Sequence, residues 1–206
     1  MQHAVLLHGT QGSDVDYFWF GHLRDHLAGH GFDVMWPLLP HTEHPVVEET
    51  VDFLHGTLPS LDSSSVVVAH SSGCPLLLSF LERHPTAVGL VVLVAGFYIP
   101  VRDREVSRTV IQPTYDWERI RAGLGKVLLI NADNDPWGCD DVQARPVAAA
   151  LGGLLLTVPG YGHMGSSKYG QPMREFPLLE GIIDALLAVS GSSLQAAVQA
   201  PASSVG

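Results

Sequence analysis

Six short runs of valine, leucine and isoleucine recur along this chain of 206 residues, and they constrain its fold more than any other feature. The runs are almost continuously apolar, which is typical of strands buried on both faces of a sheet. They span Ala4–Leu7, Phe32–Leu38, Ser65–His70, Gly89–Ala95, Lys126–Ala132 and Gly153–Val158.

The segments between these runs carry apolar residues at helical spacing. The expected helices are Tyr17–His30, Val46–Leu58, Cys74–His84, Asp141–Leu151 and Phe176–Val189. Regular alternation of strands and helices predicts a doubly wound, mostly parallel six-stranded sheet with helices on both faces. We expect one α/β domain over residues 1–190. Residues 191–206 contain no charged side chain and are expected to be a low-complexity tail.

Composition and charge exclude several classes of protein. Apolar residues make up 46% of the chain and charged residues 16%, as in a globular protein. The net charge of −10 repels phosphate groups, so neither a nucleic acid nor a membrane is an expected partner. The start, MQHAVLLHG, lacks the basic region of a signal peptide, and Cys74 and Cys139 form no CxxC pair. We therefore expect a cytoplasmic protein with free thiols.

The end of the third run has the pattern of a nucleophile elbow. In doubly wound sheets, ligands bind beyond the carboxyl ends of the strands, and the sequence there is Ala-His-Ser-Ser-Gly at 69–73. Small residues two positions either side of a serine allow the tight strand-turn-helix bend that exposes its hydroxyl. This spacing favours Ser71 as the nucleophile over Ser72, whose equivalent neighbours are His70 and Cys74.

An acid and a histidine follow in the order that an α/β-hydrolase requires. The fifth run leads into Asp133-Asn134-Asp135-Pro136-Trp137, and the sixth leads into the segment containing His163. His163 is the expected general base. Asp135 is favoured over Asp133 as its partner, because Asp133 lies almost on the strand.

Main-chain donors for an oxyanion hole are expected on two loops. The elbow supplies the N–H of Ser72, and the glycine-rich loop His8-Gly9-Thr10-Gln11-Gly12 should supply the second from Thr10 or Gln11. The same loop is not a phosphate-binding P-loop, since no Gly-Lys-Ser/Thr follows it.

Aromatic residues after the fourth and fifth runs are candidates for substrate binding. Phe97, Tyr98 and Trp137 could line an acyl pocket. The stretch Gly96–Tyr115 is too short for a large cap domain, so an open active site is expected.

Histidines elsewhere invite a metal hypothesis. His22, His26 and His30 are spaced to share one helical face, but the sequence shows no further ligand, so no metal site is expected. His41 and His44 could shape a pocket after the second run, although solvated loop histidines are the simpler interpretation.

Several motifs together resemble a known family. HGTQG, PLLPH, AHSSGC, LVAGF, NADNDPW and GYGHMGSSKYG occur in the order seen in small serine hydrolases similar to the retinoblastoma-binding protein nine group. That resemblance implies an α/β-hydrolase sheet of order 2-1-3-4-5-6, little or no lid, and a Ser71, Asp135 and His163 triad. Ala69 departs from the glycine usual in the family.

The first functional hypothesis is hydrolysis of a small ester, thioester or activated amide through an acyl-enzyme on Ser71, in the manner of a carboxylesterase. A small-molecule acyl compound is the expected partner, and no cofactor is expected. The alternatives are acyl transfer or cyclisation with the same residues, and a non-catalytic binding protein on the same fold.

Overall fold

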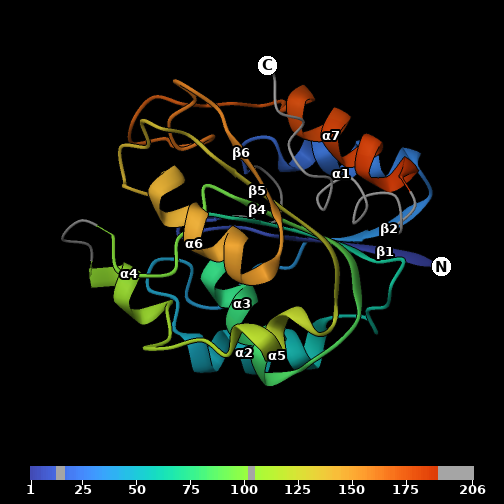
Figure 1. The fold of residues 1–206 in the computed structure, drawn as a ribbon. Coiled ribbons are helices and arrows are strands. Elements are labelled where there is room, and N and C mark those ends of the chain that lie inside the picture. The colour runs from blue at the N-terminus through green and yellow to red at the C-terminus, as the bar shows by residue number, and fades with distance from the viewer. Residues whose placement is uncertain (13–16, 102–104, 190–206) are drawn as a thin grey trace, which may run out of the picture.

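The six apolar runs form one parallel sheet in the computed structural model, which describes residues 1–12, 17–101 and 105–189 (Figure 1). The strand order is β2-β1-β3-β4-β5-β6, and every neighbouring pair is parallel, as the sequence predicted. The strands are β1 (Gln2–Leu7), β2 (Phe32–Met35), β3 (Val66–His70), β4 (Val88–Val94), β5 (Leu124–Asn131) and β6 (Leu154–Thr157).

Alternate residues of the strands enter two separate cores, one on each face of the sheet. In β1, for example, Val5 and Leu7 enter one core, and Ala4 and Leu6 enter the other. Both sets are fully buried, which explains why this part of the strand is continuously apolar in sequence.

Five helices cover the sheet close to the predicted positions. The helices α2 (Val47–Thr57), α3 (Gly73–Arg83) and α6 (Asp141–Leu151) pack on one face, and α1 (Phe20–Gly29) and α7 (Pro177–Ala188) pack on the other (Figure 1). The predicted first helix starts later than expected, because Tyr17–Trp19 precede it as a non-helical segment. The second strand ends before Pro37, which has no N–H to continue the ladder.

Two short helices, α4 (Glu105–Thr109) and α5 (Trp117–Arg121), were not predicted. Each has only five residues, which is too few for a clear apolar period. They lie between β4 and β5 and are the only helices in the described part of that connection, so no large cap is present there. The expected tail at 191–206 lies outside the described residues. Among the helices described, none is both long enough and apolar enough to cross a membrane.

Candidate active site

Ser71 occupies a strained turn between β3 and α3, as the elbow pattern predicted. Its φ angle is 54°, in the left-handed region that residues with a Cβ rarely adopt. Gly73 starts the helix beside β1, and a Cβ built on it would lie 2.6 Å from the carbonyl oxygen of Leu7. A glycine two positions after Ser71 is therefore a steric requirement, because α3 and β1 approach each other too closely at Gly73 for a side chain to fit.

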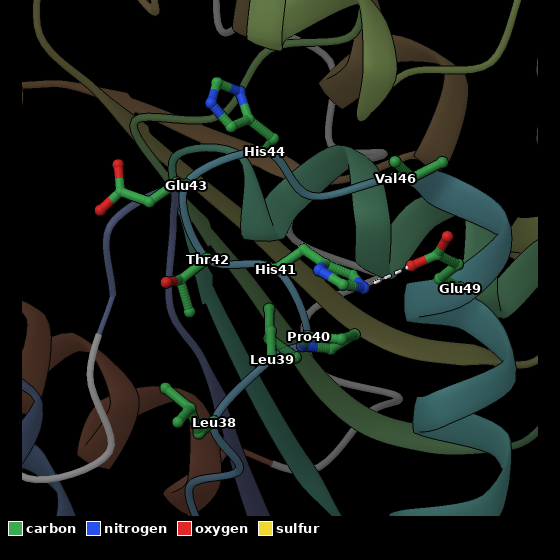
Figure 2. Close-up of a pocket in the computed structure, with 9 residues that line it drawn as sticks. All are labelled: Leu38, Leu39, Pro40, His41, Thr42, Glu43, His44, Val46 and Glu49. Carbon is green, nitrogen blue, oxygen red and sulfur yellow. Dashed lines mark ion pairs between the residues drawn. The ribbon is translucent and has the colours of Figure 1, made fainter.

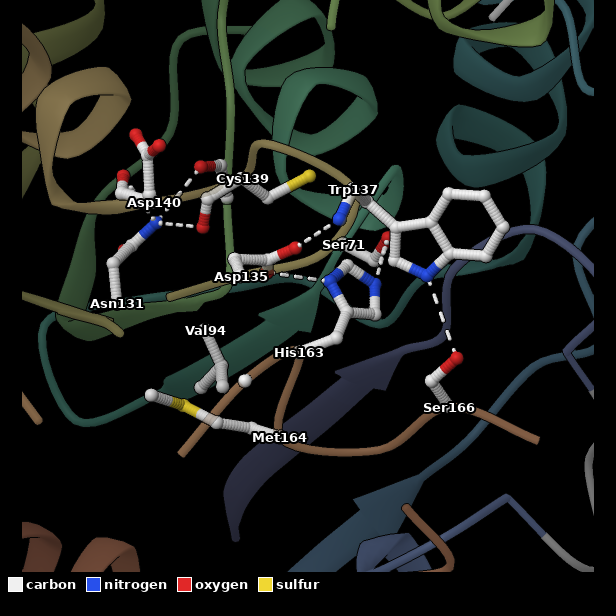
Figure 3. Close-up of polar contacts among 12 residues, drawn as sticks. Ser71, Val94, Asn131, Asp135, Trp137, Cys139, Asp140, His163, Met164 and Ser166 are labelled. Carbon is white, nitrogen blue, oxygen red and sulfur yellow. Dashed lines mark hydrogen bonds and ion pairs between the residues drawn. The ribbon is translucent and has the colours of Figure 1, made fainter. Parts of the chain in front are cut away.

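Three loops bring Ser71, His163 and Asp135 into one hydrogen-bonded chain (Figure 3). His163 Nε2 lies 2.9 Å from Ser71 Oγ, and His163 Nδ1 lies 2.7 Å from Asp135 Oδ2. Since a carboxylate only accepts, Nδ1 carries the imidazole proton and Nε2 accepts from the serine hydroxyl. His163 and Asp135 are both buried, so water competes little for these contacts.

The structure distinguishes the two aspartates that follow β5. Asp135 contacts His163 and also accepts from the Trp137 N–H at 2.7 Å. Asp133 instead accepts from the Gly160 N–H at 3.0 Å, which ties two loops together. The sequence preference for Asp135 matches this placement.

The His163 loop is held by side chains from neighbouring segments. The His163 main-chain N–H donates to Gln171 Oε1 at 2.9 Å, and the Trp19 indole donates to the Met164 carbonyl at 2.7 Å. These two contacts hold the loop that carries the imidazole. Asn131, at the end of β5, instead holds the segment after Asp135, since it donates to the carbonyls of Gly96 and Cys139 (Figure 3).

The loop after β1 places Thr10 beside the elbow and directs Gln11 away from it. The Thr10 N–H donates to Ser72 Oγ at 2.7 Å, and the two hydroxyls lie 2.9 Å apart. The Gln11 N–H donates to the Thr42 carbonyl at 2.7 Å. Of the two alternatives for the second oxyanion donor, Thr10 lines the cavity beside Ser71 and Gln11 does not.

A buried chain of polar contacts behind the serine was missed by sequence reasoning. The Gly9 N–H donates to Tyr17 Oη at 3.0 Å, and Tyr17 Oη lies 2.9 Å from His70 Nδ1. His70 Nε2 lies 2.9 Å from the His163 carbonyl, which only accepts. Nε2 therefore carries the His70 proton, and the Tyr17 hydroxyl donates to Nδ1.

Burial keeps the side chains of Tyr17 and His70 neutral. Desolvation raises the pKa of the Tyr17 phenol and lowers the pKa of His70 to about 3. Nearby His163 and His8 lower the pKa of His70 further by repulsion, while its hydrogen bond to the His163 carbonyl raises it. No sequence signal marks this pairing, since Tyr17 and His70 are far apart in the chain.

A cavity beside Ser71 contains two of the three predicted aromatic residues. Phe97 and Trp137 line it, together with Thr10, Ser71, Ser72, Val101, Ser107 and Cys139. Tyr98 does not line it and instead packs against Trp117, with ring centroids 6.0 Å apart. Sequence reasoning missed Val101 and Ser107, which come from the connection between β4 and α5.

The cavity beside Ser71 is small. It has a volume of about 20 Å³, close to the space one water needs. Val101 and Ser107 both line it, and the Val101 N–H donates to Ser107 Oγ at 3.3 Å. The connection after β4 therefore contributes side chains to the site without forming a large cap domain.

A larger groove of about 740 Å³ lies on the segment after β2 (Figure 2). His41 and His44 help to line it, and His41 Nε2 pairs with Glu49 at 2.8 Å. Gln11 connects the groove to the oxyanion loop, since its side chain donates to Glu43 at 3.0 Å. None of the three residues of the Ser71, His163 and Asp135 chain lines the groove.

One possible set of metal ligands lies in the site itself. Atoms of Asp135, Cys139 and His163 lie within 4.8 Å of one another. However, both ring nitrogens of His163 are engaged inside the site, Nδ1 with Asp135 and Nε2 with the Ser71 hydroxyl, so neither is open to an ion. The donor set therefore fits proton transfer better than metal binding.

Proteins of other organisms resemble this chain in sequence and in structure. The YdeN protein of Bacillus subtilis (strain 168) is 26% identical over 168 residues, which cover 77% of this chain and 88% of YdeN. Serine hydrolase RBBP9 of Rattus norvegicus is 23% identical over 174 residues, which cover 83% of this chain and 91% of RBBP9. The crystal structure of the ydeN gene product has a TM-score of 0.83 at 22% identity and covers 92% of this chain and 100% of that chain.

More distant structures share the fold. A carboxylesterase structure from Nitrososphaera gargenis has a TM-score of 0.65 at 13% identity and covers 90% of each chain. The resemblance expected from the motifs is thus confirmed, and so is the α/β-hydrolase fold. The sequence model of the serine hydrolase family matches residues 4–177, and this chain therefore belongs to that family.

Proposed function

We propose that this serine hydrolase cleaves a small ester, thioester or activated amide through an acyl-enzyme on Ser71. The observation that supports this proposal best is the hydrogen-bonded chain from Ser71 through His163 to Asp135, with the serine held at a φ angle of 54°. A nucleophile, a base and an orienting carboxylate in this order match the requirements of acyl transfer.

In the proposed first step, Ser71 Oγ attacks the substrate carbonyl while its proton moves to His163 Nε2. Asp135 then stabilises the imidazolium through the Nδ1–H bond. The negative charge that develops on the carbonyl oxygen is accepted by the main-chain N–H groups of Ser72 and Thr10. For Thr10 this requires the Ser72 hydroxyl, which now accepts from that N–H, to give up or share the bond.

Collapse of the tetrahedral intermediate breaks the bond to the leaving group, which takes the proton from His163. A water molecule then attacks the acyl-enzyme, again losing its proton to His163, and the Ser71 hydroxyl is restored as the acid product departs. Each cycle consumes one water and returns every enzyme group to its starting protonation state.

The narrow cavity supports a small acyl group, and we propose carboxylesterase-type substrates. Phe97, Val101 and Trp137 supply an apolar lining beside Ser71. Gln11, which follows Thr10, donates to Glu43 in the groove after β2, and we assign a larger alcohol or thiol portion of the substrate to that groove. The shared fold with a carboxylesterase is consistent with this class.

We also propose a cytoplasmic location. Cys74 is a buried thiol that is not part of a disulfide, as suits a protein that functions in a reducing compartment.

Substitution of the two adjacent serines tests the proposal. Ser71→Ala should reduce the hydrolysis of p-nitrophenyl acetate by at least about 10³-fold and abolish labelling by a fluorophosphonate probe, because the nucleophile is lost. Ser72→Ala should lower the rate by less than about tenfold, because alanine keeps the main-chain N–H. Both variants should keep the parent's circular dichroism spectrum. Undiminished hydrolysis by folded Ser71→Ala would refute the assignment.

A further inference from the structure

The helices α1 and α7 lie side by side on one face of the sheet and place histidines opposite carboxylates (Figure 1). His22 and His26 lie one turn apart on α1, and His30 caps its carboxyl end. Glu180 and Asp184 lie one turn apart on α7. The histidine spacing by itself lacks a further ligand, and α7 supplies one.

Three of these side chains converge with the spacing of a metal site. His26 Nε2 lies 2.9 Å from Asp184 Oδ1, and His30 Nε2 lies 3.4 Å from the same oxygen. The ligand atoms of all three residues lie within 4.8 Å of one another. In a tetrahedral zinc site with bonds of about 2.0 Å, ligand atoms are separated by roughly 3.3 Å. Small side-chain movements are therefore enough to enclose an ion.

Glu180 lies near the same histidines. Its side chain is only 11% exposed, and one oxygen lies 2.6 Å from His22 Nδ1. The other oxygen lies 4.0 Å from His26 Nδ1, which is longer than a hydrogen bond. Histidines that bind metal through one nitrogen commonly direct the other to a carboxylate, and Glu180 is the carboxylate near the Nδ1 atom of His26.

We propose that His26, His30 and Asp184 bind one divalent transition metal ion, with Zn²⁺ as the representative ion. Two imidazoles and one carboxylate suit Zn²⁺, whereas Mg²⁺ and Ca²⁺ prefer sites made of oxygen atoms. Water completes the coordination, since these are only three protein ligands. The His30 side chain is 47% exposed, so the ion has direct access from solvent.

Metal binding here joins two helices that are far apart in the sequence. His26 belongs to α1 near the start of the chain, and Asp184 belongs to α7 near its end. An ion that binds only the folded arrangement stabilises the native state in proportion to its concentration. The site is separate from Ser71 and goes beyond the proposed hydrolysis.

Calorimetric titration of ZnCl₂ into the full chain, without a polyhistidine tag, tests this site. We expect one Zn²⁺ per chain, a higher midpoint of thermal unfolding with Zn²⁺, and no comparable response to Mg²⁺. Asp184→Asn and His26→Gln should each weaken Zn²⁺ binding by at least about tenfold, because each removes one ligand without a large change in shape.

His84→Gln is the matched control. His84 stacks on His55 at a centroid distance of 4.0 Å, so it belongs to a different close pair of histidines. This variant should bind Zn²⁺ as the parent does. Equal binding by Asp184→Asn and the parent, or a loss of binding in His84→Gln, would overturn the proposal.

Anomalous diffraction from crystals of the unmodified protein grown with Zn²⁺ gives a test that needs no variant. A zinc peak within bonding distance of His26, His30 and Asp184 supports the site. Zinc peaks only at other positions, or no peak at all, would contradict it.

Discussion

At the scale of single residues, geometry distinguishes between nearby residues of the same type in the site. Ser71 and Ser72 are adjacent, yet only Ser71 contacts His163, while the Ser72 hydroxyl binds Thr10. Asp133 and Asp135 are two positions apart, yet only Asp135 contacts His163. In each pair the side chain's direction at the end of a strand decides the contact.

Substitution of the two aspartates should have unequal effects on catalysis. Asp135→Asn should lower kcat by roughly 10³–10⁴-fold, because an amide does not hold the imidazole in the tautomer that accepts the serine proton. Asp133→Asn should lower kcat by less than about threefold, since it alters only the contact to Gly160. Steady-state kinetics on one ester will measure both. A larger loss in Asp133→Asn would reassign the acid.

At the scale of elements, the loops after the strands supply the site and the connection after β4 narrows it. Apolar periodicity locates the strands and long helices because burial imposes it on many consecutive residues. The five-residue helices α4 and α5 escape that pattern. Sequence reasoning identified Phe97 as a lining residue of the cavity but not Val101 or Ser107.

Enlarging the cavity at Val101 should change the preferred acyl chain. Val101 is buried and lines the space beside Ser71, so Val101→Ala should raise the kcat/KM ratio of butyrate over acetate esters by about tenfold. Ile99→Ala is the matched control, because Ile99 lies in the same connection, is exposed and does not line the cavity. An unchanged ratio in folded Val101→Ala would show that this side chain does not limit the acyl group.

At the scale of the whole molecule, buried polar contacts join segments from both halves of the chain. Tyr17 and His70 link the loop after β1 to the main chain of His163. The cores on the two faces of the sheet hold these segments in place without a further domain. The neutral state of His70 is one consequence of that burial.

Stability should fall in mild acid because of His70. Its pKa is about 3 in the folded protein, against about 6.5 for an ordinary histidine, so between these values the unfolded chain binds a proton that the native state does not. The contribution of neutral His70 to the free energy of unfolding is fully present above pH 6.5. It is lost by about 1.4 kcal/mol per pH unit as pH falls toward 3.

Urea unfolding at pH 8, 6 and 5 will measure this dependence. His70→Gln removes the titrating group, so its free energy of unfolding should fall less steeply with acid than that of the parent, although it starts lower because hydrogen bonds are lost. Parallel curves for the two proteins would show that His70 does not carry the effect.

The sequence by itself predicted the sheet and the long helices, and it favoured Ser71, Asp135 and His163 at the ends of three strands. Those features depend on local periodicity and on the rule that strand ends meet at one edge of a parallel sheet. Only the tertiary structure decided that Thr10 and not Gln11 faces the site, that Val101 narrows it, and that α7 presents Asp184 to the histidines of α1. These outcomes depend on contacts between residues that are distant in sequence, and such contacts cannot be predicted from the local pattern of residues.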